Sequence, residues 1–159
     1  MQKVSEAVTL PPATSLDDDP IEEALITLVS SDNVNFHLTQ TQAAISQFME
    51  AVFADAEATR LNLPLVASRE LGLIVSYMIR HNGVEPEAIS SPLKSKHMHQ
   101  LVSDLWDADF INHVDDLNAL VIAANYLAIP VLTKLVCAKI ATNIKGESVE
   151  TLRRQLGIC

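Results

Sequence analysis

The sequence predicts an α+β fold in which a small mixed sheet is covered by helices and followed by a helical extension. Three observations support this prediction. Short segments with alternating apolar residues occur in the first part of the chain, apolar stripes at helical spacing lie between them, and an almost uninterrupted helical pattern follows residue 97. The chain has 159 residues, of which 48% are apolar, enough to fill the core of one compact domain.

Two short segments predict a β-hairpin, and a third predicts a further strand. In ALITLVS (residues 24–30), Ile26 and Leu28 alternate with smaller or polar neighbours, and the turn formers SDN follow. VNFHL (residues 34–38) then returns as the second strand. RLNLPL (residues 60–65) has leucine at every second position, and its proline is typical of an edge strand rather than a central one.

Two apolar stripes predict the helices that cover the sheet. The first helix follows Thr39, with Thr39 or Thr41 as its N-cap, and the second is capped by Ser68 and stopped before Gly83. The stripes are Ile45, Phe48, Met49, Val52 and Phe53 in the first helix, and Leu71, Ile74, Val75, Met78 and Ile79 in the second.

The second part of the chain begins with a predicted surface loop and continues as helices. The loop, VEPEAISSPLKSKH (residues 84–97), holds two prolines and three serines without an apolar period. Four segments with a helical pattern follow, at residues 98–111, 115–127, 129–146 and 148–158. Gly146 is expected to end the third of these helices and Ser148 to cap the fourth.

Charge is unevenly distributed along the chain. The net charge of −9 repels phosphate backbones and argues against nucleic acid as a partner. Residues 1–24 hold one Lys against six Asp and Glu, and we expect residues 1–20 to be a disordered acidic lead because they also hold prolines and no apolar period. Residues 129–159 hold five Lys and Arg against two Glu, so this segment could receive an acidic neighbour.

Catalytic and metal-binding signatures are absent from the sequence. Cys137 and Cys159 form neither a disulfide framework nor a metal-binding spacing, and Cys137 is predicted to act as a small hydrophobe on its helix. His97 and His99 lack a third ligand nearby and are predicted to be solvated loop residues. We therefore expect no enzyme, no metal and no cofactor. A run of about 18 uncharged apolar residues is also missing, so we expect an intracellular protein without a membrane partner.

Several sequence blocks resemble the S-phase kinase-associated protein 1 (Skp) family. They are WDADFI (residues 106–111), AANYLAIPVL (residues 123–132) and CAKIATNIKGESVETLRRQLGI (residues 137–158). Upstream, ITLVSSDNVNF and LNLPLVASRELGLIVSYMIRHN are similar to the family's opening strands and second helix. The resemblance implies a BTB/POZ fold, with residues 21–127 as the BTB/POZ core and residues 128–159 as F-box-binding helices.

The family resemblance also implies a function and its sites. It implies an adaptor, in the cytoplasm and nucleus, that links a cullin scaffold to F-box substrate receptors in an SCF ubiquitin ligase. Asn125 and Tyr126 within AANYL match positions at which the family contacts the cullin. The F-box surface would come from apolar positions of the last two helices, namely Leu132, Leu135, Val136, Ile140, Ile144, Leu152, Leu156 and Ile158.

Residue patterns alone leave other interpretations open. They favour the apolar positions of the last helices as core, and they allow Tyr126 to be half-buried with its hydroxyl in water. Trp106, near Leu105 and Phe110, is predicted to anchor the core rather than bind a partner. The family usually continues past residue 158 with a further helix, so either the sequence is truncated or its F-box site is smaller. The alternative function is a self-associating BTB/POZ scaffold, for example a relative of elongin C or a member of a complex without a cullin.

Overall fold

A three-stranded mixed sheet forms one end of the molecule. This computed structural model describes residues 23–54, 57–145, 147–155 and 157. Strand β2 (Leu25–Val29) lies in the centre, with β3 (Asn35–Thr39) antiparallel on one side and β4 (Arg60–Asn62) parallel on the other. The predicted hairpin is confirmed, and the third strand lies at an edge as predicted. The predicted disordered lead, residues 1–20, lies outside the described residues.

The leucines of the third predicted strand do not all face the core. Leu63 is buried in the core, but Leu65 is 76% exposed. Strand β4 ends at Asn62 and the chain turns at Pro64, so the period of two no longer assigns side chains to one face. The strand predicted over residues 60–65 is therefore shorter than predicted.

The helix predicted from Thr39 is instead two short helices, α2 (Gln40–Ala43) and α3 (Gln47–Val52). Thr39 caps α2 in a capping box with Gln42, as one of the two predicted caps. The break occurs because Ser46 takes an extended conformation and its side chain accepts the Met49 N–H, which starts a new helix. A continuous apolar stripe therefore did not mean a continuous helix.

Helix α4 (Ser68–His81) packs between the sheet and the other helices. Its stripe is buried as predicted at Leu71, Ile74, Val75 and Met78, whereas Ile79 is 46% exposed. The helix ends at Asn82 and Gly83, both with positive φ. At Gly83 a Cβ atom would lie 2.5 Å from the Thr41 carbonyl oxygen, so glycine permits the close contact with α2.

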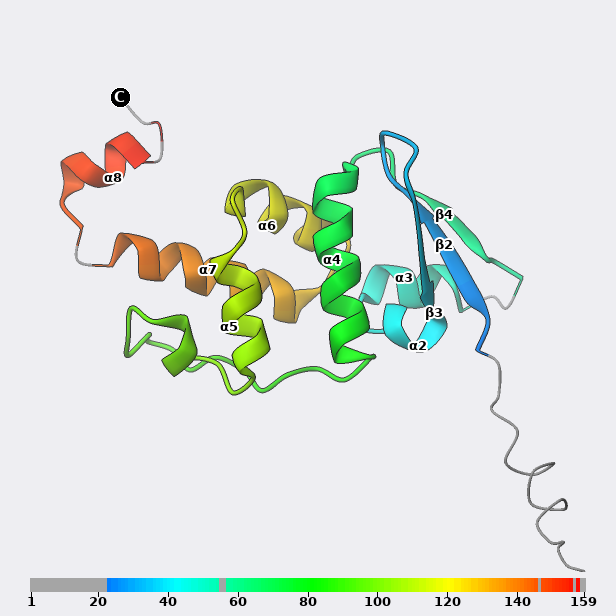
Figure 1. The fold of residues 1–159 in the computed structure, drawn as a ribbon, viewed down its shortest axis with the longest axis horizontal. Helices are drawn as coiled ribbons and strands as arrows, with labels where there is room; N and C mark the ends of the chain where they lie inside the picture. Colours follow the sequence, from blue (N-terminus) through cyan, green and yellow to red (C-terminus); the bar gives the residue numbers. More distant parts are fainter. Residues whose placement is uncertain (1–22, 55–56, 146, 156, 158–159) are drawn as a thin grey trace, which may run out of the picture.

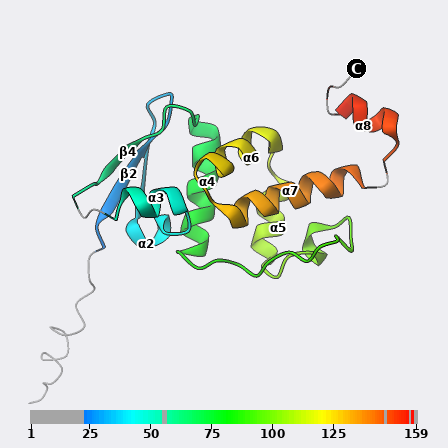
Figure 2. The same ribbon diagram turned by 180° about the vertical axis from the view of Figure 1, so that it is seen from behind.

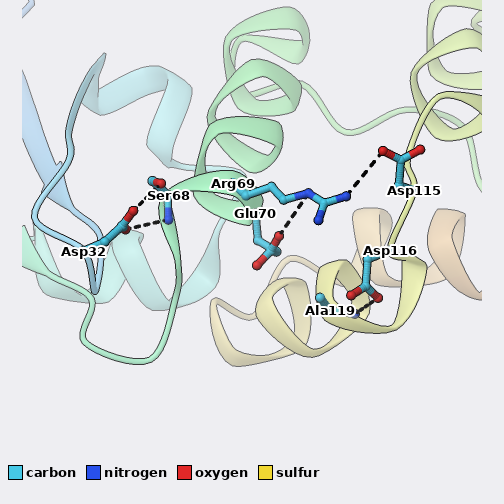
Figure 3. A network of polar contacts seen from close by, with 7 residues as sticks. All are labelled: Asp32, Ser68, Arg69, Glu70, Asp115, Asp116 and Ala119. Carbon is cyan, nitrogen blue, oxygen red and sulfur yellow. Dashed lines mark hydrogen bonds and ion pairs between the residues drawn. The ribbon is translucent and has the colours of Figure 1, made fainter.

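Ser68 is the first residue of α4 and not its N-cap, which corrects the prediction. The N-cap residue, Ala67, has no capping side chain. Asp32 from the β2–β3 turn replaces it, because its carboxylate accepts the Ser68 backbone N–H at 2.8 Å and the Ser68 hydroxyl at 2.5 Å. Ser30 donates to the same carboxylate at 2.6 Å. Figure 3 shows this contact beside Arg69, which extends from the same end of α4 toward Asp115.

Asp32→Asn is expected to lower the melting temperature at pH 6, and the difference from the parent chain should shrink as the pH falls. Hydrogen bonds from Ser30 and then Ser68 lower the pKa of Asp32 to about 2. Unfolded aspartate has a pKa of about 3.9. Between about pH 4 and pH 2 the unfolded state therefore binds more protons than the folded state. The stabilisation is present above about pH 4 and is lost as the pH falls through about 2.

Melts of the two chains between pH 6 and pH 2, with an NMR titration of the Asp32 carboxyl group, measure this effect. Asp115→Asn is the control, since Asp115 is an exposed carboxylate whose ion pair with Arg69 spans 3.4 Å. A melting-temperature difference for Asp32→Asn that stays constant over this pH range would show that the carboxylate charge is not responsible.

The second part of the chain is helical, as predicted. The described elements are η2 (Met98–Gln100), α5 (Leu105–Asn112), α6 (Leu117–Tyr126), α7 (Pro130–Ile144) and α8 (Val149–Gln155). No helix or strand occurs in residues 84–97, which confirms the predicted loop. In Figures 1 and 2, α4 stands between the sheet and helices α5 to α7, and α8 lies beyond the C-terminal end of α7.

One hydrophobic core joins the sheet to the helices. It extends from Ile26 and Leu28 in β2, through Leu71 in α4, to Leu120 in α6 and Leu132 in α7. Helices α6 and α7 pack against each other, and α6 also contacts α4. The α6–α7 pair is therefore packed against α4. This packing also fixes the position of the chain that connects α6 to α7.

Trp106 is at the edge of this core. Its ring stacks on Phe110 with 5.1 Å between centroids, and the Arg80 guanidinium lies 5.7 Å from the indole centroid. The partly buried indole packs against the core as expected. Leu105, in contrast, is 59% exposed and takes no part in that contact.

Candidate functional site

The C-terminal end of α6 presents Asn125 and Tyr126 at the surface. Asn125 is exposed, and Tyr126 is 38% exposed. The Tyr126 ring packs on Phe48 of α3, with 5.8 Å between ring centroids. One side of the ring is thus fixed by the fold, while the rest remains accessible to a partner.

A Schellman motif ends α6 directly after these two residues in the sequence. The N–H groups of Ala128 and Ile129 donate to the carbonyls of Asn125 and Ala124, at 3.1 and 3.0 Å. Ala128 has φ of 52°, in the left-handed region where this motif usually has glycine. These bonds fix the last turn of α6, on which Asn125 and Tyr126 lie.

Helix α3 holds the same turn from the other side. The buried Ser46 hydroxyl donates to the Leu127 carbonyl while it accepts the Met49 N–H. The Gln47 N–H donates to the Ala128 carbonyl at 3.0 Å. The N-terminus of α3 is therefore bonded to residues 127–128, which positions Tyr126 against Phe48.

Two exposed apolar side chains, Leu65 and Ile122, extend this region. They are 76% and 69% exposed and line one surface hollow together with Ala119 and Ala123. Ile122 lies one helical turn before Tyr126 and so shares its face of α6. We define the α6 surface as Leu65, Ile122, Asn125 and Tyr126.

Sequence reasoning missed Leu65 and Ile122. In LNALVIAANYL apolar residues occur at nearly every position of α6, which indicates more apolar surface than one neighbour can cover. The width of this apolar surface was the sequence signal that could have identified Ile122 as exposed. Leu65 gave none, because its exposure depends on where β4 ends.

Charged residues lie beside the α6 surface, where α4 and α6 begin. Arg69 pairs with Asp115 at 3.4 Å, and the Asp116 carboxylate caps α6 through the Ala119 N–H at 3.0 Å. Figure 3 shows Glu70 and Asp116 near this ion pair. Glu70 also lines the hollow that contains Leu65 and Ile122. The apolar patch therefore has a charged rim, as many protein interfaces do.

The predicted F-box residues fall into three groups. Leu132, Leu135 and Val136 are buried and belong to the core. Ile140 and Ile144 are half-buried and line a hollow with Leu117, near the start of α6. The side chain of Leu152 and all of Leu156 and Ile158 lie outside the described residues.

The core position of Leu132, Leu135 and Val136 has a simple cause. Helix α7 turns these side chains into the core, where it packs against α6 and α5. A partner could reach them only if α7 moved away from the core. Ile140 and Ile144 lie further along α7, beside the start of α6, and stay partly open.

Helix α8 begins as the sequence predicts. The Ser148 hydroxyl accepts the Thr151 N–H at 3.1 Å, which makes it the cap of this helix. Gly146, the predicted end of the preceding helix, lies outside the described residues. Val149 is 63% exposed, and α8 lies beyond the body of the molecule in both views. Much of α8 is thus available for contact with another chain.

Known proteins resemble this chain over most of its length. It is 31% identical to the S-phase kinase-associated protein 1 homolog of Tetrahymena thermophila, over 84% of this chain and 81% of that protein. It is 34% identical to SKP1-like protein 1A of Arabidopsis thaliana, over 84% of each chain. It is 29% identical to the E3 ubiquitin ligase complex SCF subunit sconC of Arthroderma otae, over 84% of this chain and 82% of that protein. The chain belongs to the S-phase kinase-associated protein 1 family. No family model matches it.

This member of the family has one described group of potential metal ligands, His81, Asp104 and Asp107. All three are already engaged, since His81 Nε2 lies 2.6 Å from Asp107 and Arg80 lies 3.1 Å from Asp104. Asp104 also caps α5 through the Trp106 N–H. The cluster therefore supports the junction of α4 with α5, and the expectation of no metal stays a prediction.

The remaining cysteine and histidine predictions have mixed outcomes. His97 and His99 are both exposed as predicted, and His99 lies 2.8 Å from Asp109. Cys137 is exposed, so the expectation that its thiol packs as a small hydrophobe is wrong. Its neighbours Val136 and Ala138 turn inward, and the helix turns Cys137 outward. Among the described helices, none combines the length and apolar character of a membrane span.

Proposed function

We propose that this chain is a non-catalytic adaptor that links a cullin to F-box substrate receptors in an SCF ubiquitin ligase. The observation that carries the proposal is the match, over 84% of the chain, to relatives that include a subunit named for the SCF complex. We further propose a BTB/POZ fold with residues 21–127 as its core and residues 128–159 as the F-box-binding part. The expected place of action is the cytoplasm and nucleus.

The cullin is proposed to bind the α6 surface. Tyr126 is rigidly held, and Leu65 and Ile122 add exposed apolar area next to it. Burial of each large apolar side chain by a partner contributes roughly 1.5 to 3 kcal/mol. Three such side chains are enough for a specific contact once the cost of association is subtracted.

F-box proteins are proposed to bind at the far end of α7 and on α8. Ile140, Ile144 and the exposed Val149 offer apolar area there. Leu152, Leu156 and Ile158 remain part of this proposal. Leu132, Leu135 and Val136 act instead by holding α7 in the core. None of the four residues of the α6 surface lines the hollow that contains Ile140 and Ile144, so the two proposed sites use different side chains, as a bridging adaptor needs.

A reconstitution with purified components tests the function. A purified cullin is immobilised, and an F-box protein is passed over it with and without the chain. We expect retention of the F-box protein only when the chain is present. Failure of the chain to bind either component, or a stable homodimer that excludes the cullin, would contradict the proposal and favour the self-associating scaffold.

Ile144→Asp should reduce retention of the F-box protein while the chain itself stays on the cullin. Ile144 is half-buried in a hollow that Leu117 and Ile140 also line, and a further carboxylate there disfavours contact with an apolar partner. Val84→Asp is the matched control, because Val84 is 69% exposed in the loop after α4. Thermal melts of both variants exclude loss of the fold.

A further inference from the structure

A cavity of about 130 Å³ lies among α4, the loop that follows it, α5 and α7. Its buried part is lined by Tyr77, Asp107 and Leu135, and its mouth by exposed residues that include Glu85, Ala88 and Lys134. No residue of the α6 surface lines it. The proposed partner contacts therefore leave it unassigned.

Tyr77 is the unusual group in this cavity. Its side chain is completely buried, and its hydroxyl has no hydrogen-bond partner among the described residues. The ring cannot easily turn elsewhere, because it packs on His81 at 4.4 Å and on Phe110 at 5.8 Å between centroids. An unpaired buried hydroxyl is costly, and native structures rarely retain one without a reason.

The hydroxyl is able to donate and to accept a hydrogen bond. Burial, followed by the nearby charge of Asp107, raises the pKa of Tyr77, so the proton stays on the oxygen. Asp107 itself is held in place by His81 at 2.6 Å. The polar end of the cavity is thus fixed before any ligand arrives, which lowers the cost of binding.

The rest of the cavity is apolar and of defined size. Ile89, Val102 and Val131 line it together with Leu135. An engineered apolar cavity of about 150 Å³ accepts benzene, so a volume of this order suits a single ring. Glu85 and Glu87 at the mouth outnumber Lys134, which disfavours ligands that carry a carboxylate.

We propose that this cavity binds a small neutral phenol, with its hydroxyl paired to Tyr77 and its ring against the apolar side chains. A hydroxyl is the best match for Tyr77 because each can donate to the other. The ring replaces water at Ile89, Val102 and Val131. A bound phenol would join the loop to α5 and α7 without contact with either proposed partner surface.

The test titrates the full chain with phenol and, separately, with benzene, and follows the backbone amides of residues 85–89 and 102–103 by NMR. Tyr77→Phe removes only the hydroxyl. We expect this variant to bind phenol about fivefold more weakly than the parent chain, as loss of one hydrogen bond predicts, and to bind benzene equally well. The anion 4-hydroxybenzoate should bind the parent chain more weakly than phenol does.

Ala88→Trp provides a second variant that fills the cavity from its exposed mouth. It should abolish saturable shifts with both phenol and benzene. The proposal is overturned if phenol binds the parent chain and Tyr77→Phe equally, or if Ala88→Trp leaves phenol binding intact. Absence of saturable phenol binding to the parent chain overturns it as well.

Discussion

Replacement of Asn125 and Tyr126 together by lysine is expected to weaken cullin binding by more than about 100-fold and to leave F-box binding unchanged. Tyr126 is a rigid aromatic side chain against Phe48, and Ile122 and Leu65 extend the apolar area around it. Aromatic residues at the centre of an interface often contribute 2 kcal/mol or more. Two lysines would also place ammonium groups in a contact that must lose its water.

Titration of the purified chain against a cullin fragment and, separately, against an F-box protein measures the two affinities. The matched control is Ser76→Lys with Ser90→Lys, which adds the same two charges at exposed positions of α4 and the following loop. Equal loss of both partners by the Asn125 and Tyr126 variant, with an unchanged melting curve, would contradict the assignment of a separate cullin surface. A loss in the control variant would assign the effect to net charge.

Local sequence patterns predicted most of the fold because they depend on neighbours along the chain. Alternation gave the strand at Ile26 and Leu28, and the apolar stripe with its Asn82–Gly83 stop gave α4. The errors came from hydrogen bonds that periodicity does not contain, some of them over long sequence distances. Asp32 caps α4 from 36 residues away, and the second cap at Ser46 divides what periodicity had joined.

The candidate surfaces were less predictable than the fold. Periodicity showed that Leu132, Leu135 and Val136 share a face of α7, but it could not show that the core covers that face. The same limit applied to Ile122, whose exposure follows from the absence of a described neighbour over that side of α6. The resemblance supplied Asn125 and Tyr126, whereas the structure supplied the reason that Tyr126 is held still.

Tyr77 is a further feature that sequence reasoning could not reach. The sequence shows only that a tyrosine lies on helix α4. It does not show that the ring is completely buried and that the hydroxyl is unpaired. That arrangement depends on three parts of the chain that meet at Tyr77, namely the loop that follows α4, helix α5 and helix α7. Long-range packing therefore decides both the proposed ligand cavity and the partner surfaces.

Ser46→Ala is expected to reduce the free energy of unfolding by about 2 to 4 kcal/mol. The buried hydroxyl caps α3 by accepting the Met49 N–H at 3.1 Å, and it donates to the Leu127 carbonyl at the end of α6. Loss of a cap alone costs about 1 kcal/mol. Loss of the second bond leaves buried polar groups without a partner, which adds a further cost of about 1 to 3 kcal/mol.

Asp116→Ala separates these two contributions, because Asp116 caps α6 through a single N–H at an exposed site and should cost only about 1 kcal/mol. Urea unfolding followed by the fluorescence of Trp106, the one tryptophan of the chain, measures both variants. Equal costs would show that the Ser46–Leu127 bond contributes nothing. A larger cost for Ser46→Ala means that α3 holds the end of α6 in place. Because Tyr126 precedes Leu127, this variant should also weaken cullin binding under conditions in which it remains folded.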